Sequence, residues 1–278
     1  MPLAKPDFSA RDVYLEIKKS ISNNQKLKLA IDGALPDIDQ LDSDYEVSAS
    51  GAKLWRTISR INLNTHFTNK QLKSFYSYRM LEKENVRELY DEISLSADFQ
   101  LCPFCKERTV DGVDHFLSRS KRPGFSVFPN NLVPCCDRCN KKKGNEIPTS
   151  IGAQFLHPYF EELWSFPWLQ CRIRTTSPVS FEFYVGSVAG SCPITLNRLK
   201  NQFDKLKLNK MYAPKAAKQF VESLPEFSRL FRSGGRRNLL KSVEESESDI
   251  INSTGHSWKT AFYRSLAESE WFLSGQFT

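Results

Sequence analysis

The sequence lacks any apolar run close to the roughly 20 residues that a helix needs to cross a bilayer. Its N-terminus, MPLAKPDFSARDVY, lacks the apolar stretch of a secretory signal peptide. The chain also has no internal repeat and no extended low-complexity tract. These absences argue against a membrane-spanning or secreted protein, so we expect a cytoplasmic protein with no membrane partner.

The bulk composition is that of an ordinary globular protein. Hydrophobic residues make up 40% and charged residues 26% of the 278 residues, enough for one large domain or two small ones. The formal net charge of +7 favours an acidic partner such as nucleic acid. Because many soluble proteins are equally basic, the net charge alone identifies no function.

Four of the seven cysteines have metal-ligand spacing. They form two Cys-x-x-Cys pairs, Cys102/Cys105 and Cys136/Cys139. Two such pairs can complete a closed tetrahedral Zn²⁺ site, which leaves no open position for catalysis. We therefore expect a structural zinc that ties a small hairpin to the start of a helix, and not two chance clusters of buried thiols.

The other three cysteines fit the zinc site less well. Cys135 adjoins Cys136 and could replace it, but only Cys136 keeps the two-residue spacing to Cys139. Cys171 and Cys192 fall in predicted strand or loop and are expected to be plain buried thiols.

Three regions differ in their patterns. Residues 1–100 show helical spacing of apolar residues, with an acidic loop expected at Asp32–Ser50. In residues 101–150, Asp111-Gly112 predicts a hairpin turn between two short strands, and a helix begins near Cys136. Residues 151–278 predict a hairpin joined at Ser177-Pro178, followed by helices.

In the C-terminal helical region, Pro214 and Pro225 should divide the chain into shorter helices. The fold class that we expect is therefore α+β: a mainly helical protein with an embedded ββα core and a small β hairpin after it.

Polar residues between the cysteine pairs supply the elements of hydrolytic chemistry. Asp114 and Asn140 carry hard oxygen donors that suit Mg²⁺ or a similar ion. His115, with an ordinary pKa near 6.5, can take a proton from water at neutral pH. A base for the attacking water and a cation for the leaving oxygen are what phosphodiester hydrolysis requires.

The segments CPFC, VDHF and NNLVPCCDRCNKKKGN together resemble the HNH endonucleases, which have a ββα-metal fold and here an accessory four-cysteine zinc. The resemblance implies that His115 is the general base and Asp114 a ligand of a catalytic Mg²⁺ or Mn²⁺. It implies that Asn131 braces the loop and orients the base. Asn140 stands where the family usually has its final histidine, as in the HNN variants, and would be the second metal ligand.

Outside the motif, the flanking helices, the segment FLHPYF and the helical tail resemble HNH subunits of Septu-type anti-phage systems. Such subunits work with a partner ATPase, so the resemblance implies an ATPase partner and a role in antiviral defence. His157, within FLHPYF, is expected to be packed or hydrogen-bonded and not to line a site.

Basic residues are concentrated in the motif. Between Cys102 and Asn145, nine basic residues accompany four acidic ones, a local balance of +5. This concentration fits neutralisation of nucleic-acid phosphates, which is independent of base sequence. The residues that we expect to bind nucleic acid are Arg119, Lys121, Arg122, Lys141, Lys142 and Lys143.

Three functions follow from these patterns. The first is a metal-dependent HNH endonuclease that hydrolyses phosphodiester bonds in DNA. The alternative is a non-catalytic, zinc-stabilised nucleic-acid-binding module, which would not need Asp114, His115 and Asn131 at these places. The third is an interaction subunit that is silent without its ATPase.

Overall fold

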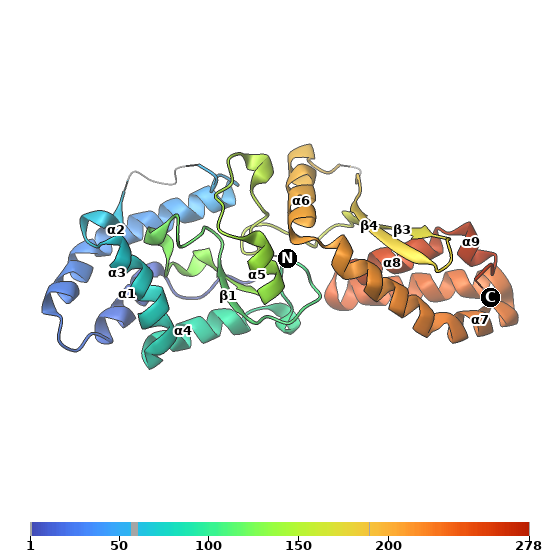
Figure 1. The fold of residues 1–278 in the computed structure, drawn as a ribbon, viewed down its shortest axis with the longest axis horizontal. Coiled ribbons are helices and arrows are strands. Elements are labelled where there is room, and N and C mark those ends of the chain that lie inside the picture. The colour runs from blue at the N-terminus through green and yellow to red at the C-terminus, as the bar shows by residue number, and fades with distance from the viewer. Residues whose placement is uncertain (1, 57–60, 189, 278) are drawn as a thin grey trace. The chain divides into compact units, whose positions relative to one another are not determined.

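Helices dominate both halves of the chain, and each half holds one small antiparallel sheet (Figure 1). The computed structural model describes residues 2–56, 61–188 and 190–277. Contacts divide the chain into two units, Met1–Leu163 and Trp164–Thr278. The expectation of a mainly helical α+β protein is confirmed. The boundary between the two units falls within the predicted region 151–278.

The first unit contains five α-helices, one π-helical turn, five short 3-10 turns and two strands among its described residues. In chain order they are α1 (Ala10–Lys19), α2 (Gln25–Ser50), η1 (Leu63–Thr65), α3 (Asn69–Ser74), η2 (Phe75–Met80), α4 (Glu84–Leu95), η3 (Asp98–Gln100), β1 (Gly112–His115), η4 (Pro123–Phe125), η5 (Pro129–Asn131), β2 (Leu132–Cys135), α5 (Asp137–Lys143) and η6 (Ile151–Ala153).

The expectation of a loop at Asp32–Ser50 is wrong, because helix α2 runs through this whole segment. Its buried residues recur every three or four positions, namely Ile31, Ala34, Ile38, Leu41, Tyr45 and Ala49. The turn-forming acidic residues lie between them, and Asp39 and Asp32 form exposed ion pairs with Arg11 and Lys18 of α1. Packing of the apolar stripe against α1 therefore overrides the local preference for a loop.

The hairpin predicted at Asp111-Gly112 is also wrong. Strand β1 pairs instead with β2, in antiparallel register from Gly112 opposite Cys135 to His115 opposite Leu132. The Asp111 carboxylate accepts a hydrogen bond from the N–H of Asp137 at 2.8 Å, so it caps α5. Asp111 therefore caps the N-terminus of α5 and does not form part of a hairpin turn.

Gly112 allows helix α4 to approach β1 closely. A Cβ atom at this position would lie 2.7 Å from the Tyr90 hydroxyl, too close for any real side chain. That hydroxyl accepts a hydrogen bond from the N–H of Val113 at 3.2 Å. Helix α4 packs on both strands, and α5 follows β2 directly, so the order strand, strand, helix is observed.

The second unit is a two-stranded sheet covered by helices. Strands β3 (Leu169–Arg174) and β4 (Ser180–Val185) pair in antiparallel register on either side of Ser177-Pro178, as predicted. Both strands pack on the long helices of this unit (Figure 1). The helices are α6 (Pro193–Leu206), α7 (Asn209–Thr254), α8 (Trp258–Ala267) and α9 (Glu270–Leu273).

The expectation of shorter helices bounded by Pro214 and Pro225 is wrong, because α7 continues through both prolines. Tyr212, Ala216, Phe220 and Phe227 are buried along it. Burial of this stripe offsets the lost hydrogen bonds at the prolines. The helix does change direction at Gly235, where φ is 57° and ψ is −143°.

No helix in the described part of the chain is long and apolar enough to cross a membrane.

Phe262 should be a principal contributor to the stability of the second unit. Its side chain is fully buried on α8, and its ring centroid lies 5.2 Å from that of Phe181 on β4. We expect Phe262→Ala to lower the free energy of unfolding by about 3–5 kcal/mol, because the truncation leaves a cavity. Val221→Ala, at a position 62% exposed on α7, is the control and should change it by less than about 0.5 kcal/mol. Equal effects in chemical denaturation would contradict this assignment of the core.

Candidate zinc centre and candidate active site

The two Cys-x-x-Cys pairs converge on one buried point. The sulfur atoms of Cys102, Cys105, Cys136 and Cys139 all lie within 4.8 Å of one another. Four sulfurs at 2.3 Å from a tetrahedral zinc would be about 3.8 Å apart, and the Cys105 and Cys136 sulfurs lie 4.0 Å apart. The donor set, its burial and its spacing fit a closed structural zinc site.

Each pair is presented by a defined backbone turn. In the first, Cys102 O accepts hydrogen bonds from the N–H groups of Cys105 and Lys106, and Lys106 adopts a positive φ of 44°. In the second, Cys136 is the N-cap of α5, and its sulfur accepts from the N–H of Cys139 at 3.4 Å. Hydrogen bonds from the other three thiols lower the pKa of Cys136. The chain thus brings together cysteines that are 31 to 37 positions apart in the sequence.

The remaining cysteines lie outside the four-sulfur group. Cys135 is buried on β2, with its sulfur 4.0 Å from that of Cys102, but it is not among the four mutually close ligands. Cys171 is partly buried. The expectation that Cys192 is buried is wrong: it is exposed as the N-cap residue of α6, at the end of the helix and not on its buried face.

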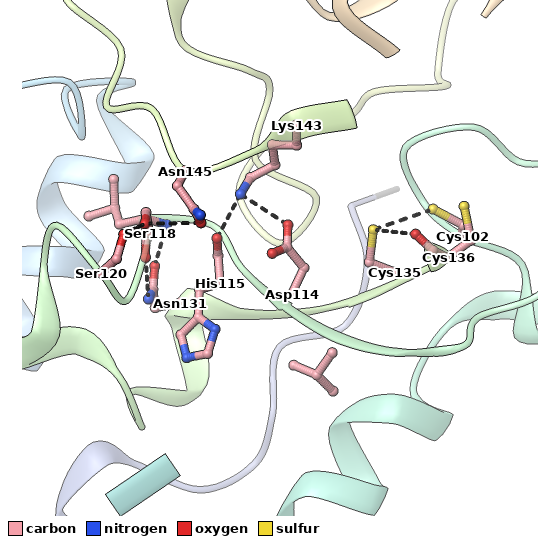
Figure 2. Close-up of polar contacts among 12 residues, drawn as sticks. Cys102, Asp114, His115, Ser118, Ser120, Asn131, Cys135, Cys136, Lys143 and Asn145 are labelled. Carbon is pink, nitrogen blue, oxygen red and sulfur yellow. Dashed lines mark hydrogen bonds and ion pairs between the residues drawn. The ribbon is translucent and has the colours of Figure 1, made fainter. Parts of the chain in front are cut away.

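Asp114 and His115 are consecutive residues of β1, and both are largely buried. Figure 2 shows the Asp114 carboxylate and the His115 ring on opposite sides of the strand, as its alternation requires. The ammonium of Lys143 lies 3.0 Å from Asp114 Oδ2 and donates to the backbone carbonyl of His115 at 2.7 Å. Burial raises the pKa of Asp114, and Lys143 opposes this shift.

The His115 imidazole is held in one tautomer. Its Nε2 lies 2.8 Å from the backbone carbonyl of Ser126, which can only accept, so Nε2 carries the proton and Nδ1 the lone pair. Its ring lies against Tyr76, with centroids 4.4 Å apart. Burial, together with the smaller effect of the nearby cations Arg119 and Lys143, lowers the pKa of His115 to about 3, although the hydrogen bond to Ser126 opposes this shift. The imidazole is therefore neutral at physiological pH.

Asn131 is fully buried and uses all four of its side-chain hydrogen-bonding positions. Its Oδ1 accepts from the N–H of Leu117 at 2.7 Å and from the Tyr45 hydroxyl at 3.1 Å. Its Nδ2 donates to the carbonyls of Leu117 at 3.2 Å and Phe125 at 2.9 Å. The side chain therefore closes the loop between β1 and η4 at both of its ends.

Asn140 is exposed on α5, three residues before Lys143. Positions three apart lie on one face of a helix, and the contact of Lys143 with Asp114 shows that this face is turned toward β1. Asn140 and Lys143 are therefore neighbours on the surface of α5. A direct contact between Asn140 and Asp114 stays a prediction.

The six basic residues expected to bind nucleic acid fall into different environments. Lys121 and Lys142 are exposed, and Lys141 is exposed but pairs with Asp137 at 2.7 Å. Arg119 and Arg122 are half-buried, and the Arg119 guanidinium lies 4.9 Å from the Tyr76 ring centroid. Lys143 is directed inward, because its ammonium is engaged by Asp114 and His115.

Several residues that build the site carry no motif signal. Ser126 contributes only a backbone carbonyl, and Tyr76 and Tyr45 come from helices far earlier in the chain. Lys143 was named from the sequence as a nucleic-acid-binding residue, but its contacts with Asp114 and His115 were not predicted. His157 is fully buried, as predicted, against Phe116, with ring centroids 4.1 Å apart.

Comparison with known proteins gives one relative for this arrangement. The chain is 27% identical over 225 residues to Protein ea31 of Escherichia phage lambda, and the alignment covers 76% of each protein. No family model matches the chain, and no solved structure matches it. The relative's name states no activity, so the function has to be argued from the site.

Zinc content tests the ligand set. The purified chain should hold one zinc, and Cys136→Ser should lose most of it on exposure to a chelator, because three thiolates bind more weakly than four. Cys135→Ser is the matched control, a neighbouring buried thiol that should leave the metal in place. Elemental analysis would contradict the ligand set if Cys135→Ser lost the zinc or if Cys136→Ser kept it.

Asn131→Ala should destabilise the first unit strongly. It leaves buried backbone groups of Leu117 and Phe125 without partners, which should lower the free energy of unfolding by about 3 kcal/mol. The neighbouring half-buried Asn130 supplies the control, since Asn130→Ala should change it by less than about 1 kcal/mol. Denaturant titration of zinc-loaded protein measures both, and an equal loss in the two variants would refute the bracing role.

Proposed function

We propose that this chain is a metal-dependent endonuclease of the HNH type, which hydrolyses phosphodiester bonds in DNA. The observation that carries the proposal is His115, a buried imidazole fixed in one tautomer by Ser126, next to Asp114 and beside the four-cysteine cluster. A purely structural zinc module has no need for a buried histidine and carboxylate at adjacent positions of a strand.

In this proposal, His115 is the general base. Because Nε2 donates to Ser126 O, Nδ1 holds the lone pair that would accept a proton from the attacking water. Burial keeps the ring neutral and therefore able to accept. Asn131 would support the base indirectly, since it holds the carbonyl of Phe125, which precedes Ser126.

Asp114 and Asn140 are the residues that would hold a divalent cation. The Lys143 ammonium, 3.0 Å from Asp114 Oδ2, supports this proposal because it is one positive charge already placed beside the carboxylate. Two protein oxygens suit Mg²⁺ or Mn²⁺, which usually keep water and substrate phosphate as further ligands. Such an ion would stabilise the charge that develops on the leaving oxygen.

Arg119 is the basic residue best placed to contact the scissile phosphate. Its guanidinium stacks on Tyr76, the same ring that contacts His115. Its Nη1 is buried and makes no hydrogen bond within the described residues, so the guanidinium would have to shift to present this donor to a phosphate oxygen. Exposed Lys121 and Lys142 would neutralise the neighbouring phosphates without reading bases.

The choice of DNA, the ATPase partner and the role in antiviral defence belong to the proposal and rest on the resemblance of the motif and its flanks. The relative in Escherichia phage lambda gives the defence role no support of its own. A nuclease whose basic residues contact backbone phosphates would cut with little sequence preference.

Plasmid cleavage tests the proposal. The zinc-loaded chain should nick or cut plasmid DNA with Mg²⁺ or Mn²⁺, and His115→Ala should lower the rate by about 100-fold or more, because general bases contribute that much. Asp114→Ala should cause a similar loss that added metal does not restore. His66→Ala is the matched control, a histidine of the same unit paired with Asp37 at 2.9 Å, and should cut at the wild-type rate.

Two results would overturn the proposal. Cleavage by His115→Ala at the wild-type rate would remove the base. DNA binding that falls steeply with salt, without cleavage under any metal or with a co-purified ATPase, would favour the non-catalytic binding module.

A further inference from the structure

The fourth hydrogen bond of Asn131 comes from outside the motif. The other three join Asn131 to Leu117 and Phe125 within the loop that follows β1. The fourth is donated by the hydroxyl of Tyr45, which lies 86 residues earlier on α2. Tyr45 is in turn 3.2 Å from His157 Nε2, 112 residues later. Helix α2, the loop after β1 and the FLHPYF segment are thus linked through the side chains of Tyr45, Asn131 and His157.

One backbone donor determines the direction of each hydrogen bond that links His157, Tyr45 and Asn131. The N–H of Tyr159 points to His157 Nδ1 at 3.3 Å, and an N–H can only donate. Nδ1 is therefore the accepting nitrogen, and Nε2 carries the proton and donates to Tyr45 Oη. The Tyr45 hydroxyl must then donate to Asn131 Oδ1, in agreement with the amide orientation that the Leu117 N–H sets, and it adds a second bond that holds the amide there.

The three hydrogen-bonded side chains are shielded from solvent, and the segment that carries His157 is held in place by further hydrogen bonds. Tyr45, Asn131 and His157 are all fully buried, so water cannot replace a lost bond without cost. The segment that carries His157 is held by its N–H, which donates to Glu161 Oε2 at 2.9 Å. The Tyr159 hydroxyl ties the same segment to the carbonyl of Leu132 on β2 at 2.7 Å.

We propose that Tyr45 and His157 are positioning residues of the active site. By orienting the Asn131 amide they fix the carbonyl of Phe125, and with it the adjacent carbonyl of Ser126 that holds His115 Nε2. The FLHPYF segment and helix α2 are then parts of the site that the motif does not include. The catalytic consequence rests on the proposed nuclease function, whereas the bracing of the loop does not.

The experiment removes individual hydrogen-bonding groups from the Tyr45–Asn131–His157 network. Tyr45→Phe deletes only the hydroxyl, and Tyr14→Phe, another fully buried tyrosine of the same unit, is the matched control. We expect Tyr45→Phe to lower kcat about 10-fold with a smaller change in KM, because a displaced base slows the chemical step. His157→Gln can keep a donor near the position of Nε2 and should retain more activity than His157→Leu.

Hydrogen exchange separates this proposal from the nuclease function. Amides of residues 116–126 should exchange about 10-fold faster in Tyr45→Phe than in wild type or Tyr14→Phe, while zinc content stays at the wild-type level. Unchanged exchange in this segment would overturn the proposal, whatever the activity. Faster exchange with an unchanged kcat in an active enzyme would overturn the catalytic part. If the wild type cuts no DNA, the nuclease proposal fails and the exchange rates alone decide the bracing role.

Discussion

Convergence of four buried sulfurs is the constraint on which the rest of the site depends. The two strands beside it have only four residues each, and α5 has seven, too little to hold a fixed geometry by apolar packing alone. The cluster joins the turn before β1 to the first turn of α5, so a bound zinc would fix the helix against the strand. The contact of Lys143 with Asp114 then sets the rotation of the helix.

Burial gives the polar residues around this frame their chemical character. A surface histidine would sample several orientations and titrate near neutrality, whereas His115 is held neutral with one nitrogen committed to Ser126. Buried polar groups need hydrogen-bond partners, and Asn131 has a partner for each of its four side-chain hydrogen-bonding positions. This requirement explains why residues as distant as Tyr45 take part.

The sequence was informative where the signal was local and chemical. Cysteine spacing identified the ligand set, and Cys136 was correctly placed at the start of α5. Local signals were misleading where packing decided the outcome. The acidic residues of Asp32–Ser50 lie between the apolar positions of a helix that packs against α1, and two of them pair with basic residues of α1. Asp111 caps a helix where Asp-Gly indicated a turn. Prolines likewise did not end α7.

By itself, the sequence determined which four cysteines form the cluster. It also named the candidates for a catalytic role, namely the Asp-His step and an asparagine at each of two motif positions. Only the tertiary structure decided how they are held. It paired β1 with β2, whose partner residues are 17 to 23 positions apart, turned Lys143 inward to Asp114, and brought Tyr45 to Asn131 and His157 to Tyr45. These contacts join residues up to 112 positions apart, and no local propensity encodes them, because they arise only when separate segments are buried together.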